Sequence, residues 1–373
     1  MPDTVVFPRN LDFQELDRRR QSLDSERMFE VLRNFPQQIQ QAMSIADSVP
    51  TRDRGIQFVE TIVVGGMGGS AIGGAVLRDL IHATEEIRRL DVKVHQSYHF
   101  PPAQSDRTLA VAVSYSGNTE ETLSFAEEAR HHTRQVICIT SGGKLAELAR
   151  DYHYVLVLIP SGYQPRCAFG FLFFTLLRLL LRYKVFPGRA EQQFNQSIEE
   201  TRLLLEQLSS HYSVLVPDNP ALQLAAHFYG KIPVFYSSTD HLAAVNARWR
   251  AQIQENAKQL AFGNLLPEMN HNEINGWQFP EQLRSAFVPV FFHDPLDHPR
   301  IQARVAISAD ILRQYTQEVF TLEGQGTKFL TRLISLIYLG DWVSYWLALM
   351  NNVDPSPVPI IQELKKRLAA LPN

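Results

Sequence analysis

A predicted long helix and the loop after it contain the residues best suited to acid–base chemistry. Glu255 stands among uncharged Gln, Asn and Ala residues. A carboxylate in such surroundings can serve as a general base, and it can equally pair with Lys258 or Arg250 on a solvated helix face. His271 follows in the run N-H-N-E-I-N-G-W, and alone it reads as a polar loop residue. Only neighbouring glutamates accompany it at ligand spacing, so no metal site is expected.

A second candidate site is an anion-binding loop after a buried strand. Residues 109–113 are small and β-branched, which indicates a parallel strand, and S-Y-S-G-N-T follows. Ser114, Ser116 and Thr119 supply hydroxyl groups there, with Thr119 as N-cap of a helix that starts at residue 120. Free N–H groups and the helix dipole favour an anion. These residue types are also common in ordinary strand-to-helix turns.

A glycine-rich turn, G-G-M-G-G-S at residues 65–70, follows an earlier strand. Its spacing does not match the dinucleotide-binding fingerprint G-x-G-x-x-G. Asp91, the candidate ribose ligand, precedes the second strand instead of ending it, so a dinucleotide site is disfavoured. The glycines would instead let the backbone approach a substrate closely, with Ser70 as a further donor. Loops at the carboxyl ends of neighbouring parallel strands converge, so we expect this turn and the anion-binding loop to share one crevice.

Strands and helices alternate along the chain in two successive patterns of similar size. In the first pattern, strands are expected at residues 60–64, 92–95, 109–113, 135–140 and 155–159. In the second, strands are expected at 213–216, 232–237, 286–292 and 318–322, with a helix at 241–259. This alternation predicts parallel sheets with helices on both faces. We expect an N-terminal helical segment at 1–48, a first sheet domain at 49–187 and a second at 188–373.

Composition narrows the class of protein. The 373 residues suit two domains, and a formal net charge of -3 gives no reason to expect nucleic acid or an anionic membrane as partner. Two cysteines exclude a disulfide framework and fit a reducing compartment. The apolar runs 169–181 and 333–350 are broken by Arg178 and Asp341, which indicates buried core helices rather than membrane spans. No secretory signal is visible, so a cytoplasmic protein is expected.

Four blocks of sequence together resemble one family. They are G-G-M-G-G-S-A-I-G-G, V-S-Y-S-G-N-T-E-E-T, P-S-G-Y-Q-P-R, and E-N-A-K followed by E-M-N-H-N-E-I-N-G-W. In this order they resemble the sugar isomerase (SIS) superfamily, and within it the bifunctional phosphoglucose/phosphomannose isomerases. The resemblance implies two SIS domains, each a five-stranded parallel sheet flanked by helices, in a homodimer. It implies interconversion of glucose 6-phosphate and mannose 6-phosphate with fructose 6-phosphate, without cofactor or metal.

The resemblance also implies roles for individual residues. Arg166 would stabilise an enediolate near C1 and C2, and Glu255 would move the proton between these carbons. His271, reaching the site from the partner subunit, would assist ring opening. A lysine of the C-terminal helix would help, either Lys365 or Lys366, of which Lys365 is favoured. The phosphate would be held by Gly69, Ser70, Ser114, Ser116 and Thr119.

Two alternatives stand beside the isomerase. One is a non-catalytic SIS module that binds a phosphosugar and regulates a partner; the joint presence of Arg166, Glu255 and His271 favours the enzyme instead. The other is an amidotransferase-type isomerase, which is disfavoured because position 2 is Pro2 and not a cysteine. Ser356 occupies the D-P-S-P run, where threonine is expected in relatives active on both epimers. The balance between glucose and mannose substrates is therefore open.

Overall fold

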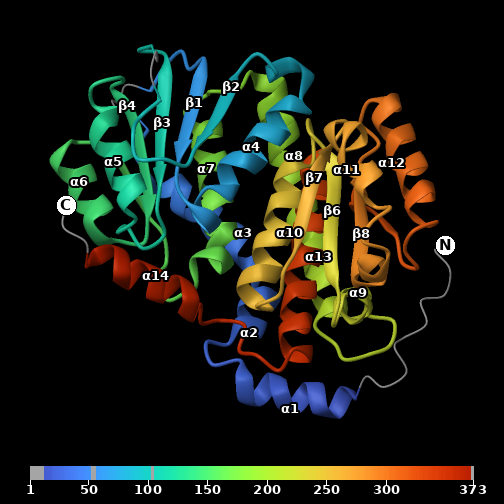
Figure 1. Cartoon of the computed structure of the whole chain (residues 1–373). Coiled ribbons are helices and arrows are strands. Elements are labelled where there is room, and N and C mark those ends of the chain that lie inside the picture. The colour runs from blue at the N-terminus through green and yellow to red at the C-terminus, as the bar shows by residue number, and fades with distance from the viewer. Residues whose placement is uncertain (1–11, 52–55, 102–104, 371–373) are drawn as a thin grey trace.

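The computed structural model describes residues 12–51, 56–101 and 105–370, which form two parallel β-sheets with helices packed around and between them (Figure 1). Helices α4 (Ile72–His82) and α10 (Ala243–Asn256) lie against each other between the two sheets. The two-sheet α/β class expected from the sequence is confirmed. These two helices form the boundary on which the candidate site is built.

The first sheet has five strands in the order β2-β1-β3-β4-β5. The strands are β1 (Thr61–Gly65), β2 (Asp91–His95), β3 (Thr108–Val113), β4 (Gln135–Thr140) and β5 (Val155–Leu158). All pairs are parallel, and β3 and β4 are buried along their whole length, as their apolar runs predict. The chain order reverses between β1 and β3. Loops that follow these two strands therefore meet at a switch point, where ligands bind in open α/β sheets.

The second sheet has four strands among the described residues, in the order β7-β6-β8-β9. They are β6 (Ile232–Ser238), β7 (Phe262–Leu266), β8 (Phe287–His293) and β9 (Phe320–Glu323), all paired in parallel. The strand expected at 213–216 is wrong, because these residues form the turn after α8 (Gly188–Tyr212), where Val214 is exposed and Pro217 follows. The described residues give this sheet four strands, where the resemblance implied five. Strand β7 was not expected, because F-G-N-L-L at a half-exposed sheet edge lacks the alternation of a typical strand.

Helices cover both sheets and join the two halves. The remaining α-helices are α1 (Phe13–Leu23), α2 (Met28–Arg33), α3 (Phe35–Ser48), α5 (Glu120–Ala129), α6 (Gly143–Asp151), α7 (Phe169–Arg182), α9 (Pro220–Phe228), α11 (Glu273–Gly276), α12 (Pro299–Leu312), α13 (Phe329–Met350) and α14 (Pro359–Ala369). Helices α3 and α7 pack together, and α13 contacts α8, α9 and α10. Short 3-10 turns include η1 (Gly68–Ser70), η3 (Pro165–Ala168), η4 (Glu268–His271) and η5 (Glu281–Ala286).

The long apolar helix α13 lies inside the molecule. Its length and composition would suffice to cross a membrane, yet 94% of its apolar window is buried by the other helices. The large buried side chains Trp342 and Trp346 stack on each other and meet Phe29 of α2 edge-on. Burial of such rings contributes much of the core energy of a domain. The interpretation of this run as a core helix is confirmed, and the buried carboxylate of Asp341 in its middle needs partners.

Candidate active site

A pocket of about 190 Å³ lies between η1 and α4 on one side and α10 on the other. Gly69 of η1, Arg166 of η3 and Glu255 of α10 all line it. These residues come from three of the sequence blocks that were singled out, and the fold brings them to one cavity. A Cβ at Gly69 would lie 2.8 Å from the Cα atom of Arg166, so only glycine allows the two turns to approach this closely.

The guanidinium of Arg166 is buried and held on three sides. Its Nε donates to Oδ1 of Asn256 at 2.5 Å. Its Nη2 donates to the carbonyl oxygens of Pro355 and Ser356 at 2.8 and 2.7 Å. Its Nη1 lies 3.5 Å from Oε2 of Glu255. A planar cation fixed in this way presents its remaining edge to the carboxylate and to the pocket.

Glu255 lies in the last turn of α10, and its side chain is 26% exposed. Its carboxylate faces the Arg166 guanidinium. Lys258 does not pair with its carboxylate: the ammonium donates instead to the main-chain oxygen of Glu255 at 2.9 Å. Arg250 donates to Oδ1 of Asn246. The alternative of a solvated ion pair with these two cations is thus not what the fold forms.

Lys258 ties the end of α10 to the D-P-S-P turn. Beyond its bond to Glu255, its Nζ donates to the carbonyl oxygens of Asn256, Asp354 and Pro355 at 3.2, 2.7 and 3.1 Å. Burial, with Arg166 nearby, lowers the pKa of Lys258 to about 8. The ammonium therefore stabilises the turn whose carbonyl groups hold Arg166. Sequence reasoning missed this role.

The anion-binding loop touches the glycine-rich turn, as the strand order requires. The Ser70 Oγ accepts the N–H of Tyr115 at 3.2 Å. Ser114 is fully buried; its Oγ donates to Oγ1 of Thr119 at 3.0 Å and accepts the N–H of Gly117 at 3.1 Å. The two loops are thus joined by a hydrogen bond at the carboxyl ends of β1 and β3, and Ser70 and Ser114 are both buried there.

The rest of this loop opens toward the start of α5. Helix α5 begins at Glu120, and Thr119 occupies the N-cap position with extended backbone, as predicted, although its side chain makes no cap bond. Ser116 is exposed and accepts the N–H of Asn118 at 3.2 Å. Gly117 has φ of +70°, and a Cβ there would collide with the neighbouring loop at Gly142. Glycine at position 117 therefore lets this loop pack against the next one, directly before the N-terminus of α5.

His271 lies far from Glu255 within one chain. It is the exposed last residue of η4, which follows β7. The end of β7 is beside the start of α10, because the Leu266 carbonyl accepts the N–H of Thr239 at 3.1 Å. Glu255 is near the other end of that helix, and 14 residues at 1.5 Å each span about 20 Å. A single chain therefore does not bring these two residues together.

Lys365 and Lys366 are exposed on α14, which begins beside the site. The first turn of this helix and Glu255 line a common hollow. Neither lysine contacts the Arg166–Glu255 pair. The helix also exposes one apolar face, formed by Ile360, Ile361, Leu364 and Leu368.

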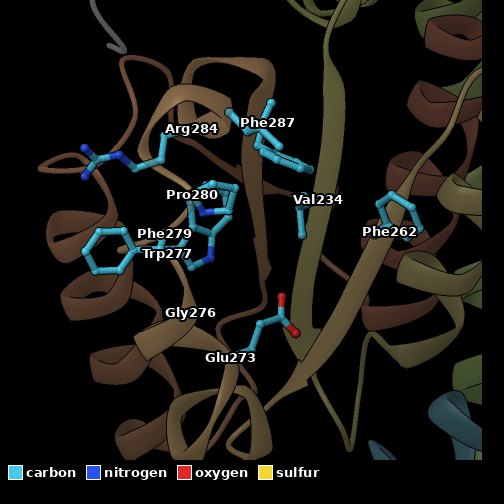
Figure 2. Close-up of a pocket in the computed structure, with 10 residues that line it drawn as sticks. Val234, Phe262, Glu273, Gly276, Trp277, Phe279, Pro280, Arg284 and Phe287 are labelled. Atoms are coloured by element: carbon cyan, nitrogen blue, oxygen red, sulfur yellow. The ribbon is translucent and has the colours of Figure 1, made fainter.

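A larger apolar pocket of about 450 Å³ lies on the second sheet (Figure 2). The side chains of Val234, Phe262, Trp277, Phe279 and Pro280 surround it, and Glu273 stands at one side (Figure 2). The carboxylate of Glu273 is already used: it accepts from the Tyr236 hydroxyl at 2.6 Å and from Asn264 at 2.8 Å. This pocket is apolar surface on the same segment as His271, rather than a second polar site.

Within residues 12–51, 56–101 and 105–370, no group of three or more His, Cys, Asp or Glu side chains is arranged to hold a metal ion.

The residues that sequence reasoning missed are polar side chains around Arg166. Arg248, Gln252 and Asn256 recur every fourth residue on α10 and are all buried. Such spacing of polar residues along one buried helix face is a signal that the sequence offered.

The fold and the paired polar loops define a protein of the SIS class. Residues 217–368 match the family described as "Bacterial phospho-glucose isomerase C-terminal SIS domain". The C-terminal domain of glucosamine-fructose-6-phosphate aminotransferase from Francisella tularensis has a similar fold, with a TM-score of 0.71 and 12% identity, covering 88% of this chain and 98% of that one.

Relatives that match most of the chain identify the family more closely. A bifunctional phosphoglucose/phosphomannose isomerase of Caldicellulosiruptor bescii is 37% identical over 346 residues, covering 92% of this chain and 99% of the relative. A D-glucosamine-6-phosphate 4-epimerase of Sulfolobus acidocaldarius is 30% identical, covering 86% of this chain and 93% of the relative. The chain belongs to the bifunctional phosphoglucose/phosphomannose isomerase family. The family resemblance drawn from the four sequence blocks is confirmed.

Proposed function

We propose that this protein interconverts glucose 6-phosphate, and mannose 6-phosphate, with fructose 6-phosphate through a cis-enediolate. The observation that carries the proposal is the pairing of Arg166 and Glu255, 3.5 Å apart, in one pocket beside the glycine-rich turn. An aldose–ketose isomerisation needs a base for an α-proton and a cation for the charge that develops on the oxygens. Both groups are present and mutually oriented.

The proton transfer assigns one role to each group. The Glu255 carboxylate removes the proton from C2 of the open-chain aldose and returns it to C1. In the same conversion the proton of the C2 hydroxyl passes to the C1 oxygen, so that C1 carries a hydroxyl and C2 becomes the carbonyl carbon. The guanidinium of Arg166 stabilises the enediolate between these steps, and it does so at little reorganisation cost because its other donors are already engaged.

The phosphate group is anchored by Gly69 and Ser70 of the turn with Ser114, Ser116 and Thr119 of the loop. The hydrogen bond between Ser70 and Tyr115 supports this assignment, because it joins the two loops beside the pocket. Binding of the remote phosphate holds C1 and C2 in place during the proton transfer, so the loops contribute to rate as well as affinity.

The active unit is a homodimer in which the partner supplies the histidine. His271 lies at the opposite end of α10 from Glu255, and this separation supports a role for the histidine of a second copy. The apolar pocket of Figure 2 lies on the His271 segment, and the apolar face of α14 lies beside Glu255. Both are surfaces of the kind that a subunit interface buries. Lys365 of α14 is proposed to assist ring opening, since the first turn of this helix lines a hollow with Glu255.

Three finer assignments complete the proposal. Ser356, whose carbonyl holds Arg166, stands where threonine is expected in relatives active on both epimers, so both glucose 6-phosphate and mannose 6-phosphate are proposed as substrates and their relative rates are to be measured. The domains are divided at 1–48, 49–187 and 188–373. The protein works in the cytoplasm, where its two buried, unpaired cysteines suit the reducing environment.

The test is conversion of fructose 6-phosphate by the wild type and by Glu255→Gln. We expect glucose 6-phosphate to form with the wild type and kcat to fall by about 10²- to 10⁴-fold in the variant. Absence of wild-type turnover on both aldose epimers would favour the non-catalytic phosphosugar-binding module. Glucosamine 6-phosphate, the type of sugar named for the epimerase relative, should not turn over.

Sharing of the site is tested by mixing two inactive variants. Each Glu255→Gln/His271→Ala heterodimer has one site with both residues intact. Random reassociation should therefore restore about a quarter of wild-type activity. No recovery in a mixture shown to exchange subunits would refute the shared site while leaving the isomerase assignment intact.

A further inference from the structure

Helix α10 buries three polar side chains on one face. Arg248, Gln252 and Asn256 are 4%, 2% and 0% exposed and stand four residues apart. Burial of polar and charged groups in a helix interface destabilises a protein unless each group is bonded. Their partners show that this face is organised around Arg166.

The first arm of the network starts at Arg248. Its guanidinium binds the carboxylate of Asp341 on α13 through two bonds of 3.0 and 2.8 Å, and its Nη2 also donates to the main-chain oxygen of Arg166 at 3.0 Å. Gln252 donates to the same carboxylate at 2.8 Å. The ring of Phe169 lies 4.6 Å from the guanidinium carbon of Arg248. These contacts fix the orientation of the Arg248 guanidinium that donates to the Arg166 carbonyl.

The second arm reaches the side chain of Arg166. Asn256, which accepts from the Arg166 Nε, donates to Oγ of Ser344 at 2.9 Å. Ser344 Oγ donates to the carbonyl oxygen of Asp341 at 2.7 Å. The hydrogen bonds thus close a circuit from the main chain of Arg166, through α10 and α13, back to its guanidinium.

We propose that Arg248 and Asp341 are positioning residues for Arg166, an inference that rests on the proposed isomerase function. The Asp341 carboxylate binds Arg248, so the Arg248 cation is neutralised and Arg166 is the arginine left facing Glu255. Removal of the Asp341 charge leaves Arg248 buried and unpaired beside the pocket it lines. It then competes for Glu255 and no longer holds the Arg166 carbonyl. The loss falls on the transition state, where the Arg166 cation meets the enediolate.

The test compares Asp341→Asn with Asp294→Asn. Asp294 is an equally buried carboxylate that binds Arg332 of the same helix α13 through bonds of 2.7 and 2.8 Å, away from the pocket. Both variants should lose stability. Only Asp341→Asn should lower kcat for fructose 6-phosphate, by about 10- to 100-fold with KM within about threefold, because a small displacement of an oriented catalytic group costs this much.

A binding measurement reads the position of Arg166 without turnover. Arabinonate 5-phosphate carries a carboxylate where the enediolate would form, and its Kd should rise by about the same 10- to 100-fold in Asp341→Asn, while the Kd of inorganic phosphate stays constant. Equal effects of Asp341→Asn and Asp294→Asn on kcat and on this Kd would overturn the proposal. If the wild type does not turn over fructose 6-phosphate, the isomerase assignment fails, and the Kd comparison still decides the positioning role.

A milder variant guards against loss of folding. Ser344→Ala removes one link of the second arm and no charge. It should lower kcat by about three- to tenfold with KM unchanged, since one buried hydrogen bond is worth roughly 1 kcal/mol. A kcat equal to that of the wild type, in a variant that folds normally by circular dichroism, would overturn the proposal if Asp341→Asn does not fold.

Discussion

The carboxyl edges of the two sheets differ in chemistry although both belong to parallel α/β sheets. Beside β1 and β3, the first edge offers Ser70, Ser114 and Thr119 with no carboxylate bonded to them. After β8, the second edge places Asp294 and Asp297, which are bound to Arg332 and His241. A phosphate would be attracted to hydroxyl and N–H groups at the first edge and repelled by carboxylates at the second.

Two sheets of similar topology can differ in chemistry through the loops at their strand ends. Both sheets have parallel strands in a similar order, whereas the loops at their strand ends carry different charges. The second half contributes in another way: α10 brings Glu255 to the first edge, and the loop after β7 carries His271. One half is proposed to bind the substrate and the other to supply acid–base groups.

The largest expected effect separates the two buried arginines. Arg166→Met should reduce kcat by about 10²- to 10³-fold, because it removes a donor aimed at developing negative charge. Arg332→Met breaks a buried ion pair at the second edge and should lower stability by roughly 3–5 kcal/mol with little effect on kcat. Steady-state kinetics and urea unfolding of both variants measure this contrast. A comparable kcat loss in both would remove the distinction between the edges.

The second effect in size concerns how stability depends on pH at the contact between α4 and α10. Asp79 of α4 accepts the N–H of Ala244 at the start of α10 at 2.8 Å, and burial raises its pKa to about 6 despite Arg78. Because the folded state holds this proton more tightly than the unfolded state, stability should fall as pH rises from about 4 to about 6. Two pKa units correspond to about 3 kcal/mol.

Asp79→Asn should abolish this decline, since the amide does not ionise in the window and still accepts the Ala244 N–H. Urea unfolding of the wild type and the variant at pH 4, 5, 6 and 7 gives the difference directly. Parallel curves across the whole range would contradict the raised pKa of Asp79.

The smallest effect compares two buried serines. Ser114→Ala should raise KM for fructose 6-phosphate by about tenfold, because the buried Ser114 hydroxyl holds Thr119 and the Gly117 N–H in the loop that is proposed to bind the phosphate. Ser238 ends β6 at the corresponding edge of the second sheet and is also buried, so Ser238→Ala is a matched control that should leave KM unchanged. Initial-rate measurements suffice. An equal rise in both variants would indicate a general loss of packing.

Local patterns were enough for most of the fold. Continuous β-branched runs predicted the strands of the first sheet, and Gly- and Ser-rich turns marked their carboxyl ends. The failures were the strand at 213–216, which a turn replaces before Pro217, and β7, which is held by its pairing with β6 rather than by its own residues. Strand propensity at an exposed edge is weak, so only the neighbouring strand decides it.

For the site, the sequence by itself determined which residue types could do the chemistry: hydroxyls and glycines after strands, a carboxylate on a helix, an arginine in Q-P-R. Only the tertiary structure decided which of them meet. Arg166 and Glu255 are 89 positions apart, and Arg248 and Asp341 are 93 apart. In the sequence Asp341 is merely an interruption of an apolar run, because a buried charge has meaning only through the partner that neutralises it. The same holds for His271, whose distance from Glu255 in one chain is set by the length of α10.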